Sequence, residues 1–374
     1  MKKYWLHFFN LFYKYVLSKI IFLFNSEVAH NVMVNMGELF GKIFFVKQLI
    51  ALLFSTKSNV LSQNIKGISF ENPIGLAAGF DYQGKFTQIL PSIGFGFGTV
   101  GTITNMPYVG NPKPRLARLF KSKSLMVYKG FKNYGIEVIS KKLKKMKFDI
   151  PIGLSIGKTN FRKDTMTQKD AIKDIMSAFK VAEKYELKNS YYELNISCPA
   201  LFGKVTFYTP KNLQELLENV DKLNIQKPIF IKMPISKSDE QISDMINVII
   251  KFKISGVILG NTQTNRNDKG FVKEELKKFP VGGFSGKPTF VRSNELIKLV
   301  FQKYGKKLII IGCGGVFSGR DAYEKIKLGA SLVQLITGLI FEGPQLAGQI
   351  NSDLITLIKK DGFKNISQAI GTSV

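Results

Sequence analysis

The sequence predicts an α/β fold: a closed (β/α)8 TIM barrel that follows an N-terminal helical extension. Two observations predict the barrel. From Asn72 onward, short apolar runs bounded by Gly or Pro recur, and stretches with helical spacing separate them. Eight such units exceed what a doubly wound sheet usually contains, so we expect a closed barrel. The extension is predicted by an aromatic, basic first segment that contains no acid before Glu27.

The first predicted element is an amphipathic helix over residues 1–24. Its aromatic side chains alternate with four lysines, and Lys14 and Lys19 interrupt the apolar run. The run is therefore too short to cross a bilayer, which needs about 20 apolar residues. No small-residue cleavage site follows, which argues against a signal peptide. Aromatics around the whole helix are typical of a helix that lies in the membrane interface; a helix that packs only on its own domain is the alternative.

A second helix is predicted from Glu27 to about Leu53, again rich in Phe and Leu. We therefore divide the chain into residues 1–55, an amphipathic helix pair that contacts the membrane, and residues 56–374, the barrel. A helical membrane-associating extension on a barrel predicts a peripheral membrane protein. We expect it on the cytoplasmic face of the cell membrane, because two cysteines cannot build a disulfide framework and indicate a reducing compartment.

The eight predicted barrel strands are short apolar runs: Ile74–Ala78, Gly98–Ile103, Ile152–Ile156, Tyr191–Ile196, Ile229–Met233, Gly256–Leu259, Leu308–Ile311 and Leu332–Ile336. Helical spacing marks the segments between them: Lys169–Tyr185, Leu213–Leu223, Asp239–Phe252, Asn294–Tyr304 and Arg320–Leu328. Two long connections, Asn105–Asn133 and Thr262–Arg292, follow the second and sixth strands. Long loops at the carboxyl ends of barrel strands commonly cover a ligand.

The composition limits the possible partners. The formal net charge is +27, but only six of the 54 basic residues are arginine, and the lysines are scattered. Nucleic-acid binding would favour clustered arginine beside exposed aromatics, so no nucleic-acid partner is expected. The two histidines both lie near the N-terminus, so no metal site is expected in the barrel.

The turns after the last two strands predict a phosphate site. Gly312-Cys313-Gly314-Gly315 follows the seventh strand, and Thr337-Gly338 follows the eighth. Barrels commonly bind phosphate between these two loops, because glycine lets backbone N–H groups approach the anion and a helix start adds its dipole. Such turns also occur for steric reasons alone, but the pairing of the two favours phosphate.

Other strand ends predict a flat ligand attached to that phosphate. Ala78 and Gly79 end the first strand, and small residues there let a flat ring lie against the backbone. Hydrogen-bonding groups follow other strands at Thr102, Asn195 and Asn261-Thr262. The combination suits flavin mononucleotide (FMN).

Lys232 ends the fifth strand. A lysine at this depth is an ion-pair partner, a Schiff-base nucleophile or a fixed cation beside an anionic ligand. With a phosphate site nearby and few acids at the rim, we favour the fixed cation, near the flavin edge that becomes negative on reduction.

Cys198 is the candidate catalytic residue. It lies in a polar turn that follows Asn195 and ends at Pro199. A thiol acts as a base near neutral pH when its pKa is lowered, and Asn195, the Ser197 hydroxyl and backbone donors are candidates for lowering it. The alternative is a small buried hydrophobic residue, which is how we interpret Cys313.

Five blocks of sequence resemble the quinone-dependent, membrane-associated class of dihydroorotate dehydrogenases. They are NPIGLAAGFD (72–81), GNPKPRL (110–116), GFSGKP (283–288), GCGG (312–315) and GASLVQ (329–334). Glu27-Val-Ala-His30, after the aromatic helix, is similar to the N-terminal signature of that class. The resemblance covers almost the whole chain.

The resemblance implies a barrel with bound FMN that oxidises dihydroorotate to orotate in pyrimidine biosynthesis and passes electrons to a membrane quinone. The N-terminal helix pair would then give the quinone its access. FMN contacts are implied at Ala78, Gly79, Thr102, Asn195, Lys232, Gly286, Gly315 and Thr337, and substrate contacts at Phe131, Asn195, Asn261 and Thr262. Cys198 is implied as the base.

The chain departs from the family pattern around the substrate. Cys198 stands where the quinone class usually has serine, and Tyr82, Val127 and Ala200 stand where the family has a lysine and two asparagines. Ser155 replaces an asparagine at the flavin. A site that lacks such partners binds a polar acid less well, which predicts a raised Michaelis constant.

Lys129 and Lys132, in the loop near Phe131, are candidates to replace the lost cation. Two other functions stay open: an FMN oxidoreductase of the same fold that acts on a different substrate, and a degenerate membrane-bound flavin-binding protein without turnover.

Overall fold

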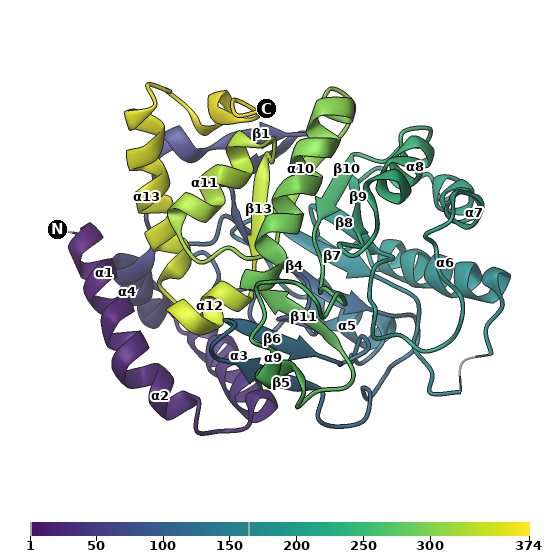
Figure 1. Cartoon of the computed structure of the whole chain (residues 1–374), viewed down its shortest axis with the longest axis horizontal. Helices are drawn as coiled ribbons and strands as arrows, with labels where there is room; N and C mark the ends of the chain where they lie inside the picture. Colours follow the sequence, from purple (N-terminus) through teal and green to yellow (C-terminus); the bar gives the residue numbers. More distant parts are fainter. Residues whose placement is uncertain (1, 164) are drawn as a thin grey trace.

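The computed structural model describes residues 2–163 and 165–374. Met1, where the predicted first helix begins, and Asp164 lie outside the described residues. Eight parallel strands close into a barrel in the order β10-β12-β13-β3-β4-β7-β8-β9. Helices alternate with these strands and surround them (Figure 1). The predicted (β/α)8 barrel is confirmed.

The barrel strands are β3 (Ile74–Leu76), β4 (Phe97–Ile103), β7 (Ile152–Ile156), β8 (Tyr191–Asn195), β9 (Ile229–Met233), β10 (Gly256–Leu259), β12 (Ile309–Cys313) and β13 (Leu332–Leu335). Each coincides with one predicted run, and nearly every residue in them is buried. A strand buried on both faces reads as a continuous apolar run, which is why the pattern located them.

The barrel helices are α5 (Ile136–Lys144), α6 (Gln168–Lys184), α7 (Pro210–Asp221), α8 (Asp239–Ile249), α10 (Phe290–Tyr304), α11 (Gly319–Lys327), α12 (Thr337–Glu342) and α13 (Leu346–Lys360). Side-chain caps fix several starts: Thr167 and Asp170 form a capping box on α6, and Ser238 and Gln241 form one on α8. The pattern missed α5, α12 and α13.

One end of the barrel is filled by side chains. A hairpin of β1 (Gln63–Ile65) and β2 (Ile68–Phe70) covers this end, and its Ile65 and Phe70 pack on an inner layer. That layer consists of Phe97, Tyr191, Phe230, Ile258, Ile311 and Leu332. A ligand therefore has room only at the opposite end, where the strands have their carboxyl termini.

The two long connections meet over that opposite end. β5 (Leu116–Leu119) and β6 (Ser124–Val127) come from the first connection, and β11 (Gly283–Gly286) comes from the second. They form an antiparallel sheet in the order β11-β6-β5 (Figure 1). A short helix, α9 (Lys273–Leu276), lies in the second connection. The expected covering loops are thus a small sheet with its own hydrogen bonds.

The N-terminal segment folds as α1 (Lys2–Phe12), a π-helical turn (Tyr13–Leu17), α2 (Ser18–Ile21), α3 (Ser26–Lys42) and α4 (Phe44–Phe54). The prediction of one unbroken second helix is wrong, because Ile43 has extended backbone and separates α3 from α4. The end of α3 packs closely on the barrel at Gly41, because a Cβ there would lie only 2.8 Å from Gln88 Cβ.

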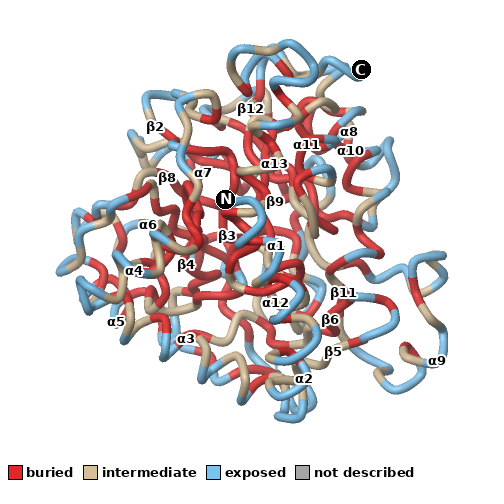
Figure 2. The backbone as a smooth tube through the Cα atoms, turned by 90° about the vertical axis from the view of Figure 1, so that its left-hand side faces the viewer, coloured by how far each residue is buried: buried red, intermediate tan, exposed pale blue. Residues whose placement is uncertain are grey.

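These helices pack against the barrel rather than apart from it. Asn10 of α1 donates to the backbone oxygen of Glu342 at 2.8 Å, and Lys14 forms an ion pair with the Glu342 carboxylate. The ring of Phe9 lies 4.7 Å from that of Phe54 on α4. Figure 2 shows buried residues gathered in the barrel strands, with exposed stretches along the N-terminal helices.

Candidate active site

One chamber lies at the carboxyl ends of the barrel strands and is bounded by β5, β6 and β11. It encloses about 1200 Å³ of empty space, including the part open to solvent. Its lining includes every predicted site residue: Ala78, Gly79, Thr102, Phe131, Asn195, Cys198, Lys232, Asn261, Thr262, Gly286, Gly315 and Thr337. The structure thus brings together residues from seven strand ends and both long connections, and their individual roles stay predictions.

The phosphate end of the chamber is built from closely packed backbone. Gly286 and Gly315 have φ values of +90° and +70°, which favour glycine. A Cβ at Gly338 would collide with the Val316 carbonyl oxygen, and one at Gly286 would collide with that of Lys123. Thr337 begins α12, whose first backbone N–H groups have no partner inside the helix. A cradle of this kind suits an anion.

The floor of the chamber is flat. Gly79 has a φ of +112°, and a Cβ there would meet only Ile336 Cδ1, at 3.5 Å, within 4 Å. Ala77 and Ala78 precede it, so the end of β3 presents no large side chain. A planar ring fits against such a surface. The flat floor and the anion cradle belong to one chamber, and together they fit the ring and the phosphate of FMN.

A chain of hydrogen bonds crosses the barrel below the chamber. Asn195 Nδ2 donates to Thr102 Oγ1 at 2.8 Å, and Thr102 Oγ1 lies 2.9 Å from Ser155 Oγ. Ser155 donates to Glu193 Oε1 at 2.8 Å, and Lys232 Nζ lies 3.6 Å from the same oxygen. Lys232 therefore lines the chamber and also has an ion-pair partner, which the favoured interpretation did not include. Sequence reasoning missed Glu193, although a glutamate in an apolar strand was the signal.

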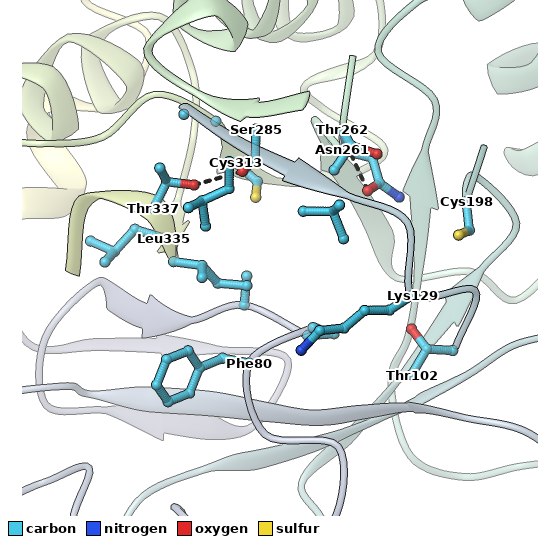
Figure 3. A pocket seen from close by; sticks show the side chains of 18 of the residues that line it. Phe80, Thr102, Lys129, Cys198, Asn261, Thr262, Ser285, Cys313, Leu335 and Thr337 are labelled. Carbon is cyan, nitrogen blue, oxygen red and sulfur yellow. Dashed lines mark hydrogen bonds between the residues drawn. The ribbon is translucent and has the colours of Figure 1, made fainter. Parts of the chain in front are cut away.

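Cys198 is half-buried at the chamber wall, in the turn after β8 (Figure 3). Burial raises the pKa of its thiol to about 11, and the Ala200 backbone hydrogen bond and the Lys232 charge offset only part of that rise. The expectation of a lowered pKa is therefore wrong for this chamber, since desolvation disfavours the thiolate.

The Ser197 hydroxyl is not free to assist the thiol. It donates to Asn195 Oδ1 at 3.1 Å and accepts from Asn261 Nδ2 at 2.7 Å. The Asn261 side chain in turn accepts from the Thr262 backbone at 2.8 Å. Cys313 also lines the chamber, and burial raises the pKa of its thiol. The Cys313 side chain packs on the inner layer of the barrel, which agrees with the prediction that Cys313 is a packing residue.

The residues that depart from the family pattern lie in the same chamber. Tyr82, Val127 and Ala200 all line it, and so does Lys129. Lys129 is only 5% exposed, and Figure 3 shows its side chain extending across the chamber. Its amine donates to the Tyr82 hydroxyl. A buried cation, Lys129, therefore lines the chamber together with the uncharged residues Val127 and Ala200.

A second cleft, of about 710 Å³, adjoins the chamber under the N-terminal helices. It is lined by α3, the π-helical turn and the rim of the barrel, and it shares five residues with the chamber: His30, Phe80, Leu116, Leu125 and Ile340. Its lining is mostly apolar. The sequence analysis did not predict this cleft, although the segment Glu27–His30, which belongs to the helix that lines it, was a signal for it.

Two polar side chains mark the cleft. His30 Nε2 lies 2.8 Å from the Phe80 carbonyl oxygen, and burial, with the nearby Lys129 charge, lowers the pKa of His30 to about 4. The imidazole is therefore neutral at neutral pH. Arg118 Nε donates to Ser26 Oγ at 2.9 Å, and its guanidinium lies 4.7 Å from the centre of the Phe22 ring.

The surface around the cleft is unusually apolar. Of the 28 exposed large hydrophobic side chains in the described part of the chain, 19 lie within residues 2–55. Tyr4 and Phe45 are 80% and 81% exposed. No single helix within residues 2–163 and 165–374 is long and apolar enough to cross a membrane; α1–α2 and α3, bent by 119°, reach the required length and composition only together.

The chain is similar to known proteins over most of its length. Residues 60–358 match the sequence model of the family described as dihydroorotate dehydrogenase. A relative from Trichodesmium erythraeum, named dihydroorotate dehydrogenase (quinone), is 35% identical over 96% of this chain and 98% of its own. One from Christiangramia forsetii, with the same name, is 37% identical over 92% and 98%.

Solved structures agree with these relatives. The crystal structure of DHODH from Eimeria tenella in complex with ferulenol has a TM-score of 0.80 and 27% identity, and it covers 93% of this chain and 95% of that one. The ligand-free form from the same organism has a TM-score of 0.77 and 28% identity, with 90% and 98% covered.

Proposed function

This chain belongs to the dihydroorotate dehydrogenase family, and we propose that Cys198 is the base of its reaction and that a quinone enters through the cleft under the N-terminal helices. The quinone names of the relatives assign the reaction: dihydroorotate is oxidised to orotate in pyrimidine biosynthesis, and a quinone accepts the electrons. Of the three functions that the sequence left open, the relatives thus support this one.

The cofactor of the family is FMN. We assign its phosphate to the cradle of Gly286, Gly315 and Thr337, and its ring to the floor at Ala78 and Gly79. Thr102, Asn195 and Lys232 would then line its polar edge. Held by these residues, FMN would supply the hydride acceptor for the substrate and the electron donor for the quinone.

The position of Cys198 carries the proposal for the base. Oxidation of dihydroorotate removes hydrogens from two neighbouring carbons, and one of them leaves as a proton. Cys198 is half-buried in the turn after β8 and lines the chamber together with Asn195, Asn261 and Thr262. The thiolate accepts the proton at Sγ, and the charge of Lys232 stabilises that thiolate.

The raised pKa sets the rate of this step. With a pKa of about 11, Cys198 is a thiolate in roughly one molecule in 10³ at pH 8. A strong base present in small amount still drives the reaction, because its proton affinity rises as its population falls. The rate of substrate oxidation should therefore increase with pH through the neutral range.

The substrate contacts complete the proposal for the chamber. Phe131, Asn195, Asn261 and Thr262 line the same chamber as Cys198, and we assign the substrate ring to them. Formation of orotate, followed by its absorbance with a soluble quinone present, tests the reaction. Purified protein that forms orotate at no measurable rate would contradict the assignment.

The N-terminal helices are the proposed route of the quinone. The second cleft has an apolar lining and shares walls with the chamber, and apolar side chains surround its helices. A quinone head inserted there would reach the edge of the chamber at Phe80 and Ile340. We propose that residues 1–55 lie in the membrane interface, at the cytoplasmic face, while residues 56–374 hold FMN.

A further inference from the structure

Lys129 is a buried cation that forms no ion pair in the described part of the chain. Its side chain is 5% exposed, follows β6 and extends into the chamber (Figure 3). The Nζ donates to the Tyr82 hydroxyl and lies 4.5 Å from the centre of the Tyr82 ring. Across residues 2–163 and 165–374, no carboxylate forms an ion pair with it. Glu27 is already bonded to Arg115 at 2.9 Å and to Lys132 at 3.2 Å.

The other lysines of the chamber differ in this respect. Lys232 has Glu193 at 3.6 Å, and Lys132 has Glu27. A buried charge that lacks a counter-ion destabilises the folded protein, so such a group usually faces a ligand of opposite charge. Burial lowers the pKa of Lys129 to about 7, and the charge of Glu27, which Arg115 and Lys132 already neutralise, offsets only part of that shift. An anionic ligand would restore its charge.

Tyr82 supplies a second donor at the same point. Burial raises the pKa of this phenol, so the hydroxyl stays protonated at neutral pH. It accepts from Lys129, which leaves its own proton to donate. The His30 ring packs 5.5 Å from the Tyr82 ring and limits its movement. An ammonium and a hydroxyl therefore lie side by side, while Val127 and Ala200 give the neighbouring wall no charge.

We infer that Lys129 and Tyr82 together bind the carboxylate of the substrate, with Lys129 as the charged partner and Tyr82 as the neutral donor. This inference rests on the proposed function, because it takes dihydroorotate and orotate as the ligands of the chamber. A carboxylate accepts two hydrogen bonds from such a pair, and bonds to charged groups are the stronger ones. Lys129 would thus determine specificity for an acidic pyrimidine over its neutral analogue.

The test compares two ligands on the FMN-loaded protein, through the change each makes in the flavin absorbance. Lys129→Met keeps the length and apolar stem of the side chain. It should weaken orotate binding about 10- to 100-fold, the range for a lost bond to a charged group, and change the affinity for uracil, which lacks the carboxylate, less than twofold. The Michaelis constant for dihydroorotate should rise more than kcat falls.

Two further variants keep the inference open to refutation. Lys121→Met, on the exposed turn of the same hairpin, should bind orotate as the wild type does. Tyr82→Phe removes only the hydroxyl and should weaken orotate binding severalfold while keeping the fold, so it replaces Lys129→Met if that variant is unstable. Orotate affinity unchanged in Lys129→Met or Tyr82→Phe would overturn the inference.

The wild type separates this inference from the proposed function. If it binds orotate through Lys129 but does not oxidise dihydroorotate, the carboxylate site stands and the proposed reaction fails. If it oxidises dihydroorotate and the Lys129→Met variant has an unchanged Michaelis constant, the reaction stands and the site is refuted. If it neither binds orotate nor oxidises dihydroorotate, both are refuted.

Discussion

Arg115 Nε donates to both carboxylate oxygens of Glu27, at 2.9 Å each, and so ties the first turn of α3 to the segment that leads into β5. Lys132 adds a third contact at 3.2 Å. Burial alone would raise the pKa of Glu27, but the bonds from Arg115 and Lys132 outweigh it and lower the pKa to about 2. The stability that this carboxylate contributes is present above its unfolded pKa and is lost as pH falls from about 4.5 toward 2.

Glu27→Gln should therefore loosen the helices that form the cleft. We expect the rate of quinone reduction to fall severalfold while dihydroorotate reduces the flavin at the normal rate, because the chamber keeps its lining. Glu38→Gln is the matched control, because Glu38 also lies on α3 but pairs with Lys142 of α5, away from the residues that line the cleft. Equal loss of both half-reactions would argue against a separate quinone route.

The exposed apolar side chains of the N-terminal helices should bind membranes. Phe8 and Phe45 are 59% and 81% exposed on α1 and α4. Replacing both by serine should reduce binding to phospholipid vesicles in a flotation assay by about tenfold or more, given the area of two aromatic rings. Phe161→Ser with Val291→Ser, at exposed sites on the barrel, should bind vesicles like the wild type. Vesicle binding that survives the helix substitutions would refute the interface.

The flat floor predicts a selective loss of flavin. In Gly79→Ala the added methyl would project into the chamber, where the flavin ring is assigned. The purified variant should carry at least tenfold less FMN while its helical content is kept. Gly362→Ala, at another glycine of positive φ (+78°) with nothing within 4 Å of a Cβ, should keep its FMN. Extraction and chromatography of the cofactor measure both, and FAD in place of FMN would contradict the single phosphate cradle.

Cys198 predicts a pH dependence of known sign. Because the base acts as a thiolate and its pKa is raised to about 11, the rate of flavin reduction should rise about tenfold per pH unit from pH 7 to about 10. Cys198→Ala should lose about 10²–10⁴-fold, the usual contribution of a positioned base, and Cys198→Ser should keep part of the rate with its rise moved to higher pH.

The control for the thiol is Cys313→Ala, which should reduce flavin at close to the normal rate. A Cys198→Ala protein that does the same would show that this thiol only packs, and a rate that is flat between pH 7 and 10 would place the base elsewhere.

The sequence predicted those features that depend on local pattern. Strands buried on both faces, such as Ile152–Ile156 and Ile229–Met233, are unbroken apolar runs, and glycine marked the turns of the phosphate cradle. The residues at the strand ends then had to meet in one chamber, because a parallel barrel brings all its carboxyl ends together.

The remaining features depend on contacts between distant segments. Gly283–Gly286 pairs with Ser124–Val127 across more than a hundred residues, and no local signal reports such a pairing. The ion pair of Lys232 with Glu193 and the raised pKa of Cys198 arise from burial, which the sequence around each residue does not reveal. The extended residue Ile43 reflects how α3 packs on the barrel.

The most direct test of the account is the colour of the bound flavin under anaerobic conditions. Dihydroorotate added to the purified wild type, without oxygen, should bleach the flavin absorbance, and a quinone added afterwards should restore it. Bleaching by dihydroorotate that quinone does not reverse would support the substrate and contradict the quinone as electron acceptor. If the flavin stays fully oxidised after dihydroorotate is added at every pH between 7 and 10, the central claim that this chamber oxidises dihydroorotate is contradicted.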